Sequence, residues 1–229
     1  MIAGQMDYSQ SVISITAADG HVLDTYLTEP HTKPVAGLIV CQDAFGVGDY
    51  IKEVCVHYAR LGYKVAAPSF YDRQQKGAIL NHSPAGLESA RALRKGSCWD
   101  HVVLDAAAAM TAVSDAGRTG ILGFCVGGSM AWYCASRLRM NAASCYYGKD
   151  IVGWLDRPPA CPIELHFGTF DHLIPQTDVN VIRTAQPQVT LYTYEAGHGF
   201  DGRGRGHDDA ASNAARDRTK AFFEMHLCK

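Results

Sequence analysis

The sequence lacks several features that define large classes of protein. No apolar run approaches the roughly 20 residues that a membrane-spanning helix needs, and Met1 to Gln10 contain neither the basic nor the apolar part of a secretory signal. Lysine and arginine total 21 against 23 acidic residues, and no basic block could follow a nucleic-acid backbone or an anionic membrane. We therefore expect a cytoplasmic protein without nucleic-acid or membrane partners.

Metal and disulfide patterns are also missing. The eight cysteines form neither CxxC pairs nor the dense, even spacing of a disulfide scaffold, and there is no HExxH or Cys/His metal spacing. The cysteines lie at positions 41, 55, 98, 125, 134, 145, 161 and 228. Most are expected to be reduced, and the ordinary role for any one of them is that of a small buried apolar residue. The sequence predicts neither a metal ion nor a cofactor.

What the sequence does contain is a regular alternation of strand and helix patterns. The 229 residues are 47% hydrophobic and 19% charged, which fits a single globular domain over residues 1–229. Strands are predicted at 12–16, 22–28, 35–42, 64–68, 119–124, 143–147, 163–168 and 189–194, and helices at 50–61, from 83–84, at 99–113, from 126 to about 139, at 181–185 and at 210–227. This order predicts an α/β fold with helices on both faces of a mainly parallel sheet and an antiparallel hairpin, turning at 18–20, at its edge.

One predicted strand leads directly into a cysteine flanked by glycines. The segment 123–128 has the sequence GFCVGG and sits between a strand and a helix, which is the setting of a nucleophile elbow with Cys125 in place of the usual serine. Glycines leave room for a sharp turn, and the positive end of the helix dipole favours a thiolate. The alternative is an ordinary tight turn with a packed thiol.

An acid and a histidine follow later strands. Asp171 comes after the strand at 163–168, and His198 comes after the strand at 189–194. Each has an ordinary alternative, because Asp171 could cap a helix and His198 could be a loop histidine. The order nucleophile, acid, histidine is nevertheless that of α/β-hydrolases, and both residues follow the carboxyl ends of strands. We therefore predict Cys125 as nucleophile, His198 as base and Asp171 as the acid that orients the histidine.

Several blocks of sequence, taken in order, resemble one known family. They are QDAFGV at 42–47, PSFY at 68–71, GFCVGG at 123–128, YYG at 146–148 and the segments around Asp171 and His198. Over nearly the whole chain these blocks resemble the dienelactone hydrolase family, which implies an α/β-hydrolase fold with a cysteine elbow. The resemblance also implies an oxyanion hole formed by the backbone N–H groups of Ala44 and Val126.

The same resemblance suggests how the thiol is controlled. In the family, a glutamate of the first loop pairs with the resting thiol and moves when substrate binds. Asp43 stands at that position and is one methylene shorter, so the same hydrogen bond would require a closer backbone. The alternative is that Asp43 is an ordinary acid in a turn.

Substrate-binding candidates follow from the resemblance as well. Family members that take dienelactone hold its carboxylate with arginines, whose planar fork suits bidentate contacts. Arg73 fits one such position, while the second falls near Gly202, with Arg203 and Arg205 just beyond it. For these last two, surface solvation is the alternative. Tyr147 is a further candidate, and residues 73–101 are expected to form much of a cap.

The predicted reaction is hydrolysis of a small, dienelactone-like ester or lactone through a thioester at Cys125. A thiolate leaves more readily than an alkoxide, so enol lactones and enol or aryl esters are the expected substrates. The alternatives are a carboxylesterase acting on another small activated ester, and a non-catalytic binding or redox-sensing domain. Either enzyme would act on a small molecule as a monomer or a homodimer.

Overall fold

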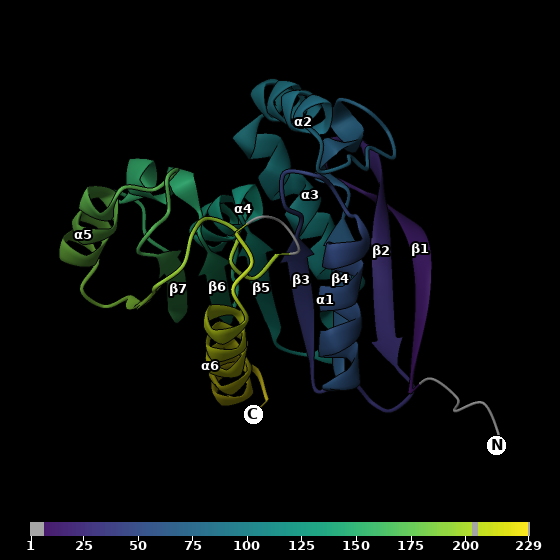
Figure 1. The fold of residues 1–229 in the computed structure, drawn as a ribbon. Helices are drawn as coiled ribbons and strands as arrows, with labels where there is room; N and C mark the ends of the chain where they lie inside the picture. Colours follow the sequence, from purple (N-terminus) through teal and green to yellow (C-terminus); the bar gives the residue numbers. More distant parts are fainter. Residues whose placement is uncertain (1–6, 203–205, 229) are drawn as a thin grey trace, which may run out of the picture.

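A computed structural model describes residues 7–202 and 206–228 of the chain, and its central strands are buried on both faces. The described residues form one eight-stranded sheet in the order β1-β2-β4-β3-β5-β6-β7-β8 (Figure 1). The strands are β1 Tyr8–Thr16, β2 Val22–Pro30, β3 Ala36–Cys41, β4 Tyr63–Pro68, β5 Thr119–Phe124, β6 Ala142–Tyr146, β7 Ile163–Gly168 and β8 Thr190–Tyr194. Every residue of β3 to β7 is buried, as expected for parallel strands covered on both sides.

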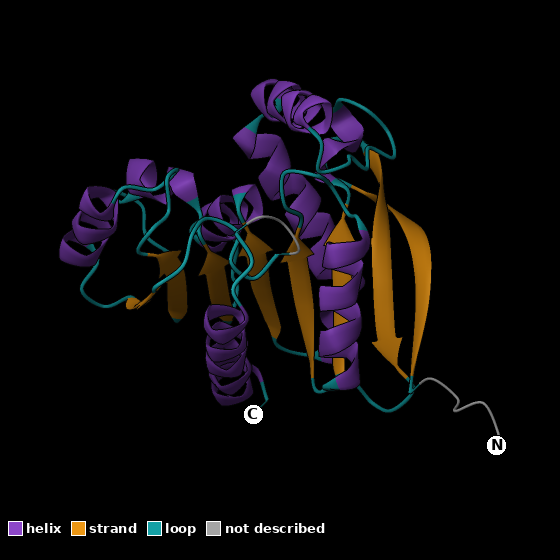
Figure 2. Cartoon of the chain, viewed as in Figure 1, coloured by secondary structure: helices purple, strands orange, loops and turns teal. Residues whose placement is uncertain are grey.

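Helices cover the two faces of the sheet. They are α1 Asp49–Arg60, α2 Pro84–Gly96, α3 Trp99–Ala112, α4 Val126–Ala135, α5 Gln176–Ala185 and α6 Asp209–Leu227, with short 3₁₀ turns at Phe70–Arg73, Ser114–Ala116 and Lys149–Trp154. Figures 1 and 2 show α1 and α6 in front of the sheet and α3 and α4 behind it. This arrangement, with the antiparallel β1–β2 hairpin at one edge, confirms the predicted α/β-hydrolase fold.

The pairing directions of the strands bring the loops that contain the predicted site residues to one edge of the sheet. Strand β2 pairs antiparallel with both β1 and β4, whereas β4, β3, β5, β6, β7 and β8 pair parallel in turn. The carboxyl ends of β3, β5, β7 and β8 therefore meet at the same edge. The segments that follow these strands contain residues 42–47, Cys125, Asp171 and His198.

Some predicted boundaries are wrong for local reasons. Helix α5 begins at Gln176, five residues before the predicted start, because Pro175 has the fixed φ of −59° that suits the residue before a helix. Helix α4 ends at Ala135 instead of continuing to about residue 139, since the Arg137 N–H donates to the Cys134 carbonyl three residues back, which tightens the last turn. Strand β6 ends at Tyr146 because Tyr147 has a positive φ of 38°.

Candidate active site

The turn between β5 and α4 is held in a conformation that few side-chain-bearing residues adopt. Cys125 has φ 56° and ψ −119°, and its N–H donates to the carbonyl of Tyr146 on the neighbouring strand. A Cβ atom on Gly123 would lie 1.9 Å from the Gly127 carbonyl oxygen, and one on Gly127 would lie 2.3 Å from that of Gln42. The two glycines are therefore required by close backbone packing, and the turn leaves the Cys125 side chain partly accessible.

Three side chains from three strand ends form a connected row. The distance from Cys125 Sγ to His198 Nε2 is 3.2 Å, and that from His198 Nδ1 to Asp171 Oδ2 is 2.8 Å. The other carboxylate oxygen, Oδ1, accepts the backbone N–H groups of Leu173 and Ile174 at 2.8 and 3.1 Å. Asp171 is thus fixed by its own loop, and the structure brings together the three residues that the sequence proposes as a triad.

The row of side chains changes the protonation of His198. Burial alone would lower the pKa of this imidazole, but its hydrogen bonds to Asp171 and Cys125 outweigh burial and raise the pKa to about 9. The ring can therefore remain an imidazolium near neutral pH, next to the sulfur atom. Such a pair favours the nucleophilic thiolate form of a cysteine.

The loop after β3 lies directly against the turn that holds Cys125. The carbonyls of Cys41 and Gln42 approach the Gly127 backbone, and the Tyr71 hydroxyl donates to the Ala44 carbonyl at 3.3 Å. Val126 is the first residue of α4, and the first N–H groups of a helix have no acceptor within it. The arrangement is compatible with the predicted oxyanion hole at Ala44 and Val126, whose role stays a prediction.

Asp43 lies in the same loop, where its carboxylate closes a turn. Oδ1 accepts the Phe45 N–H at 2.8 Å, and the Gly46 N–H donates to the Asp43 carbonyl at 3.4 Å. Burial raises the pKa of Asp43, although the Phe45 N–H and the nearby His82 act in the opposite direction. This geometry is that of an acid in a turn, while the Cys125 sulfur pairs with His198. A switching role for Asp43 stays a prediction.

Arg73 has partners that the sequence analysis does not anticipate. Its guanidinium makes two hydrogen bonds to Asp105, at 2.9 and 2.7 Å, and two to Asp19, at 2.7 and 3.1 Å. The Asp105 side chain is 1% exposed. Four of the five N–H donors of Arg73 are therefore committed to carboxylates that tie the 3₁₀ turn at 70–73 to α3 and to the β1–β2 turn. The proposed contact with a substrate carboxylate conflicts with this arrangement.

The other substrate-binding candidates separate into two groups. Tyr147 is buried, and its ring packs edge-on against the His198 ring with centroids 5.1 Å apart. It therefore supports the histidine from within the protein, and its place does not favour a substrate contact. Arg203 and Arg205 lie outside the described residues, while Gly202 is described and its N–H donates to the Gly199 carbonyl.

A cavity beside Val126 contains cationic residues that the sequence analysis misses. Its volume is about 350 Å³, and its lining includes Arg91, Arg94 and Lys95 of α2 together with Trp99, Val126 and Met130. The spacing of 91, 94 and 95 places three cations on one side of a helix, which is the signal that could have identified them. Its wall from Arg91 to Trp99 belongs to the segment 73–101 predicted to form a cap, while Val126 and Met130 belong to α4.

The described part of the chain contains neither a metal-binding cluster nor a membrane-spanning helix. Within residues 7–202 and 206–228, no group of three or more His, Cys, Asp or Glu side chains could hold a metal ion. No helix of this described part has both the length and the apolar character needed to cross a membrane.

The dienelactone hydrolase family model matches residues 23–227 of the chain. The chain belongs to the dienelactone hydrolase family. Carboxymethylenebutenolidase of Pseudomonas putida is 29% identical over 82% of this chain and 84% of its own length. Carboxymethylenebutenolidase 1 of Cupriavidus pinatubonensis is 26% identical, with 93% and 96% covered. A Klebsiella pneumoniae crystal structure, provisionally named a dienelactone hydrolase, has a TM-score of 0.79 at 26% identity, with 93% and 98% covered. Membership makes the protein a hydrolase of carboxylic esters or lactones.

The role of Arg73 in this dienelactone hydrolase family member can be tested by substitution. Arg73→Gln should lower the free energy of unfolding by about 2 kcal/mol, because Asp105 loses the charge that compensates its burial. The KM for an acidic lactone should stay within about twofold of wild type, since Arg73 has no free pair of N–H donors for a substrate carboxylate. Urea unfolding and steady-state kinetics measure the two effects. Lys76→Gln, which breaks an exposed ion pair with Asp24, is the control and should change stability little.

A second prediction concerns the pH dependence of stability. The pKa of His198 is raised from 6.5 to about 9 in the folded protein, so its protonated form stabilises the fold fully below about pH 6.5, and this contribution is lost as the pH rises through about 9. The unfolding free energy of wild type minus that of His198→Gln should therefore fall by about 3 kcal/mol between about pH 6 and pH 9.5. Substitution of the exposed His101 is the matched control. A pH-independent difference would contradict the assignment.

Proposed function

We propose that the protein hydrolyses small activated esters or lactones through a thioester formed on Cys125. The observation that carries the proposal is the row of contacts in which Cys125 lies 3.2 Å from His198, and His198 lies 2.8 Å from Asp171. These lengths match what a nucleophile, a base and an orienting acid require. Family membership supports the reaction class.

In the first half of the proposed reaction, the thiolate sulfur attacks the carbonyl carbon. The carbonyl π electrons move to the oxygen, which accepts hydrogen bonds from the backbone N–H groups of Ala44 and Val126. When the oxyanion collapses, the bond to the leaving oxygen breaks, and the His198 imidazolium gives that oxygen its proton. The products are a thioester on Cys125, a neutral His198 and an alcohol or enol, which stays attached to the acyl group when the substrate is a lactone.

The second half depends on the charge that acylation removes. A thioester sulfur carries no charge, so one of the contacts that raises the pKa of His198 is lost once Cys125 is acylated. Neutral imidazole then takes a proton from water as the water oxygen attacks the thioester. Collapse releases the acid and restores the thiolate–imidazolium pair. Asp171 holds the ring in one orientation throughout.

The leaving group decides which esters are accepted. A thiolate is expelled more easily than an alkoxide, so the first tetrahedral intermediate returns to substrate when the leaving oxygen is an ordinary alkoxide. Enol lactones and enol or aryl esters avoid this because their leaving oxygen is delocalised. The substrate class we propose is therefore activated esters, with dienelactone-like enol lactones among them.

The proposal is tested with an aryl ester on wild type, Cys125→Ala and Cys98→Ala. Activity should fall by at least ~10³-fold in Cys125→Ala and should be lost from wild type after iodoacetamide treatment. Cys98 is also accessible but lies at the start of α3, so Cys98→Ala should keep its activity and its sensitivity to iodoacetamide. Full activity in Cys125→Ala would refute the mechanism. Stoichiometric alkylation of Cys125 with no hydrolysis of any activated ester would favour a redox-sensing or binding role.

We infer from the cationic cavity that the acyl group carries a negative charge. Arg91 and Lys95 line this cavity next to Val126, whereas Arg94 on the same helix is already bound to Asp150. A carboxylate held there would lie beside the proposed oxyanion donors, and a charge-assisted hydrogen bond is typically worth about 1.5–3 kcal/mol. We therefore assign the binding of a substrate carboxylate to this cavity, in place of Arg73.

Neutralising the cavity should discriminate between substrates. Arg91→Gln and Lys95→Gln should each raise the KM for an acidic lactone about tenfold or more while leaving that for a neutral aryl ester within about twofold, because only the acidic substrate loses an ionic contact. Steady-state kinetics with both substrates measure the ratio. Arg183→Gln removes the same charge from α5 and is the matched control. Equal changes for both substrates would instead support a carboxylesterase for neutral esters.

A further inference from the structure

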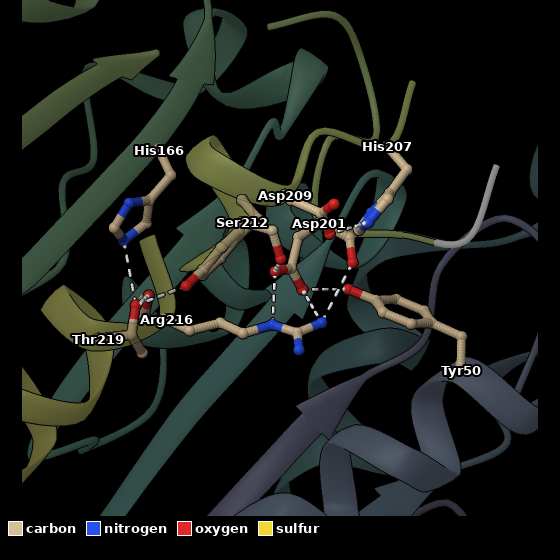
Figure 3. A network of polar contacts seen from close by, with 10 residues as sticks. Tyr50, His166, Asp201, His207, Asp209, Ser212, Arg216 and Thr219 are labelled. Atoms are coloured by element: carbon tan, nitrogen blue, oxygen red, sulfur yellow. Dashed lines mark hydrogen bonds and ion pairs between the residues drawn. The ribbon is translucent and has the colours of Figure 1, made fainter. Parts of the chain in front are cut away.

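The loop that carries His198 is fastened to two helices by a buried carboxylate. Asp201, three residues after His198, is 2% exposed. Its Oδ1 accepts Ser212 Oγ at 2.6 Å and Arg216 Nε at 2.7 Å, and its Oδ2 accepts Tyr50 Oη at 2.7 Å and a second Arg216 nitrogen at 3.2 Å (Figure 3). Ser212 and Arg216 belong to α6, and Tyr50 belongs to α1. Each oxygen of the carboxylate therefore has two donors.

A second buried tyrosine lies close to this network. The side chains of Tyr50, Tyr147 and Asp201 lie near enough to one another to interact electrostatically. Because the Asp201 carboxylate can only accept, the Tyr50 hydroxyl is the donor in their hydrogen bond. Burial raises the pKa of both phenols, so both stay protonated and able to donate. On the side of the network that faces the active site, the Tyr147 ring packs edge-on against the His198 ring.

Packing around Phe200 reinforces the same connection. Phe200 lies between His198 and Asp201 in the chain, is fully buried and packs against the Tyr147 ring with centroids 5.2 Å apart. Tyr147 itself is held at φ 38°, and its N–H donates to the His166 carbonyl at 2.8 Å. Both the chain and the ring packing of Phe200 and Tyr147 thus connect Asp201 to the imidazole, and neither connection uses Asp171.

We propose that the Asp201–Arg216–Tyr50 network, together with the Tyr147 ring packed between Phe200 and His198, is a positioning device that holds the His198 imidazole against the Cys125 sulfur. Asp171, which follows β7, holds the His198 imidazole at Nδ1. The network, which is anchored on α1 and α6, holds the loop that contains His198 and the side of the imidazole that faces Tyr147. The inference rests on the proposed function, because it assigns the network to the base of that reaction. None of the four residues touches the reacting atoms, so their effect is on geometry.

The proposal is tested with Tyr50→Phe, Arg216→Gln, Arg216→Lys and Arg218→Gln. The first removes one hydroxyl, and the second leaves a buried carboxylate without its cation. We expect both to lower kcat for an aryl ester about tenfold with KM within about twofold, because a displaced base slows the chemistry and leaves substrate binding intact. Arg216→Lys should recover part of the lost kcat. Arg218 lies on α6, the same helix as Arg216, and its guanidinium stacks on the Tyr192 ring of β8. Arg218→Gln should therefore leave kcat unchanged.

Alkylation of Cys125 by iodoacetamide supplies a measurement that needs no turnover. Because the thiolate depends on its imidazolium partner, Tyr50→Phe and Arg216→Gln should slow alkylation in the same direction as His198→Ala, and Arg218→Gln should not. If wild type hydrolyses no ester, the proposed function fails, but the alkylation rates still decide the positioning role. Unchanged kcat and alkylation in folded Tyr50→Phe would overturn the proposal, as would an equal loss in Arg218→Gln. If Arg216→Gln does not fold, Tyr50→Phe decides it.

Discussion

The backbone turn at Cys125 is the constraint on which the rest of the site depends. A positive φ on a residue with a side chain costs on the order of 1–3 kcal/mol, and it persists only where the surrounding structure enforces it. Here that enforcement comes from the hydrogen bond to Tyr146 and from the close approach of Gly127 to the loop after β3. The same backbone contacts pack the loop after β3 against the turn that begins α4. The proposed nucleophile and the proposed oxyanion donors thus belong to one packing unit.

A second strained residue stands at the end of the adjacent strand. Tyr147 follows β6 with φ 38°, and its ring lies against the histidine that Cys125 contacts. The carbonyl that receives the Cys125 N–H belongs to Tyr146, the residue immediately before it. The strained backbone at Cys125 and the strained backbone at Tyr147 therefore follow two neighbouring, paired strands, β5 and β6.

The sequence predicts the parts of this architecture that depend on local pattern and chain order. Apolar runs give the strands, and the succession of Cys125, Asp171 and His198 after strand ends is visible without coordinates. What sequence reasoning misses depends on partners distant along the chain. Arg73 looks like a free cation because its partners, Asp105 and Asp19, are 32 and 54 residues away. The role of the α2 cations cannot be predicted from the sequence, because the sequence does not show that this side of the helix lies beside Val126.

Electrostatics ties these geometric features to the proposed catalytic cycle. Asp171 is satisfied by two N–H groups of its own loop, so it can remain a fixed acceptor while the charge on His198 changes. In that proposed cycle, by contrast, the contact of His198 with the sulfur is an ionic pair only while Cys125 is unacylated. One permanent partner and one removable partner allow the same imidazole to act as an acid in the first step and a base in the second. A cysteine suits this exchange because acylation neutralises its own charge, and the loop network centred on Asp201 keeps the ring in place while that charge disappears.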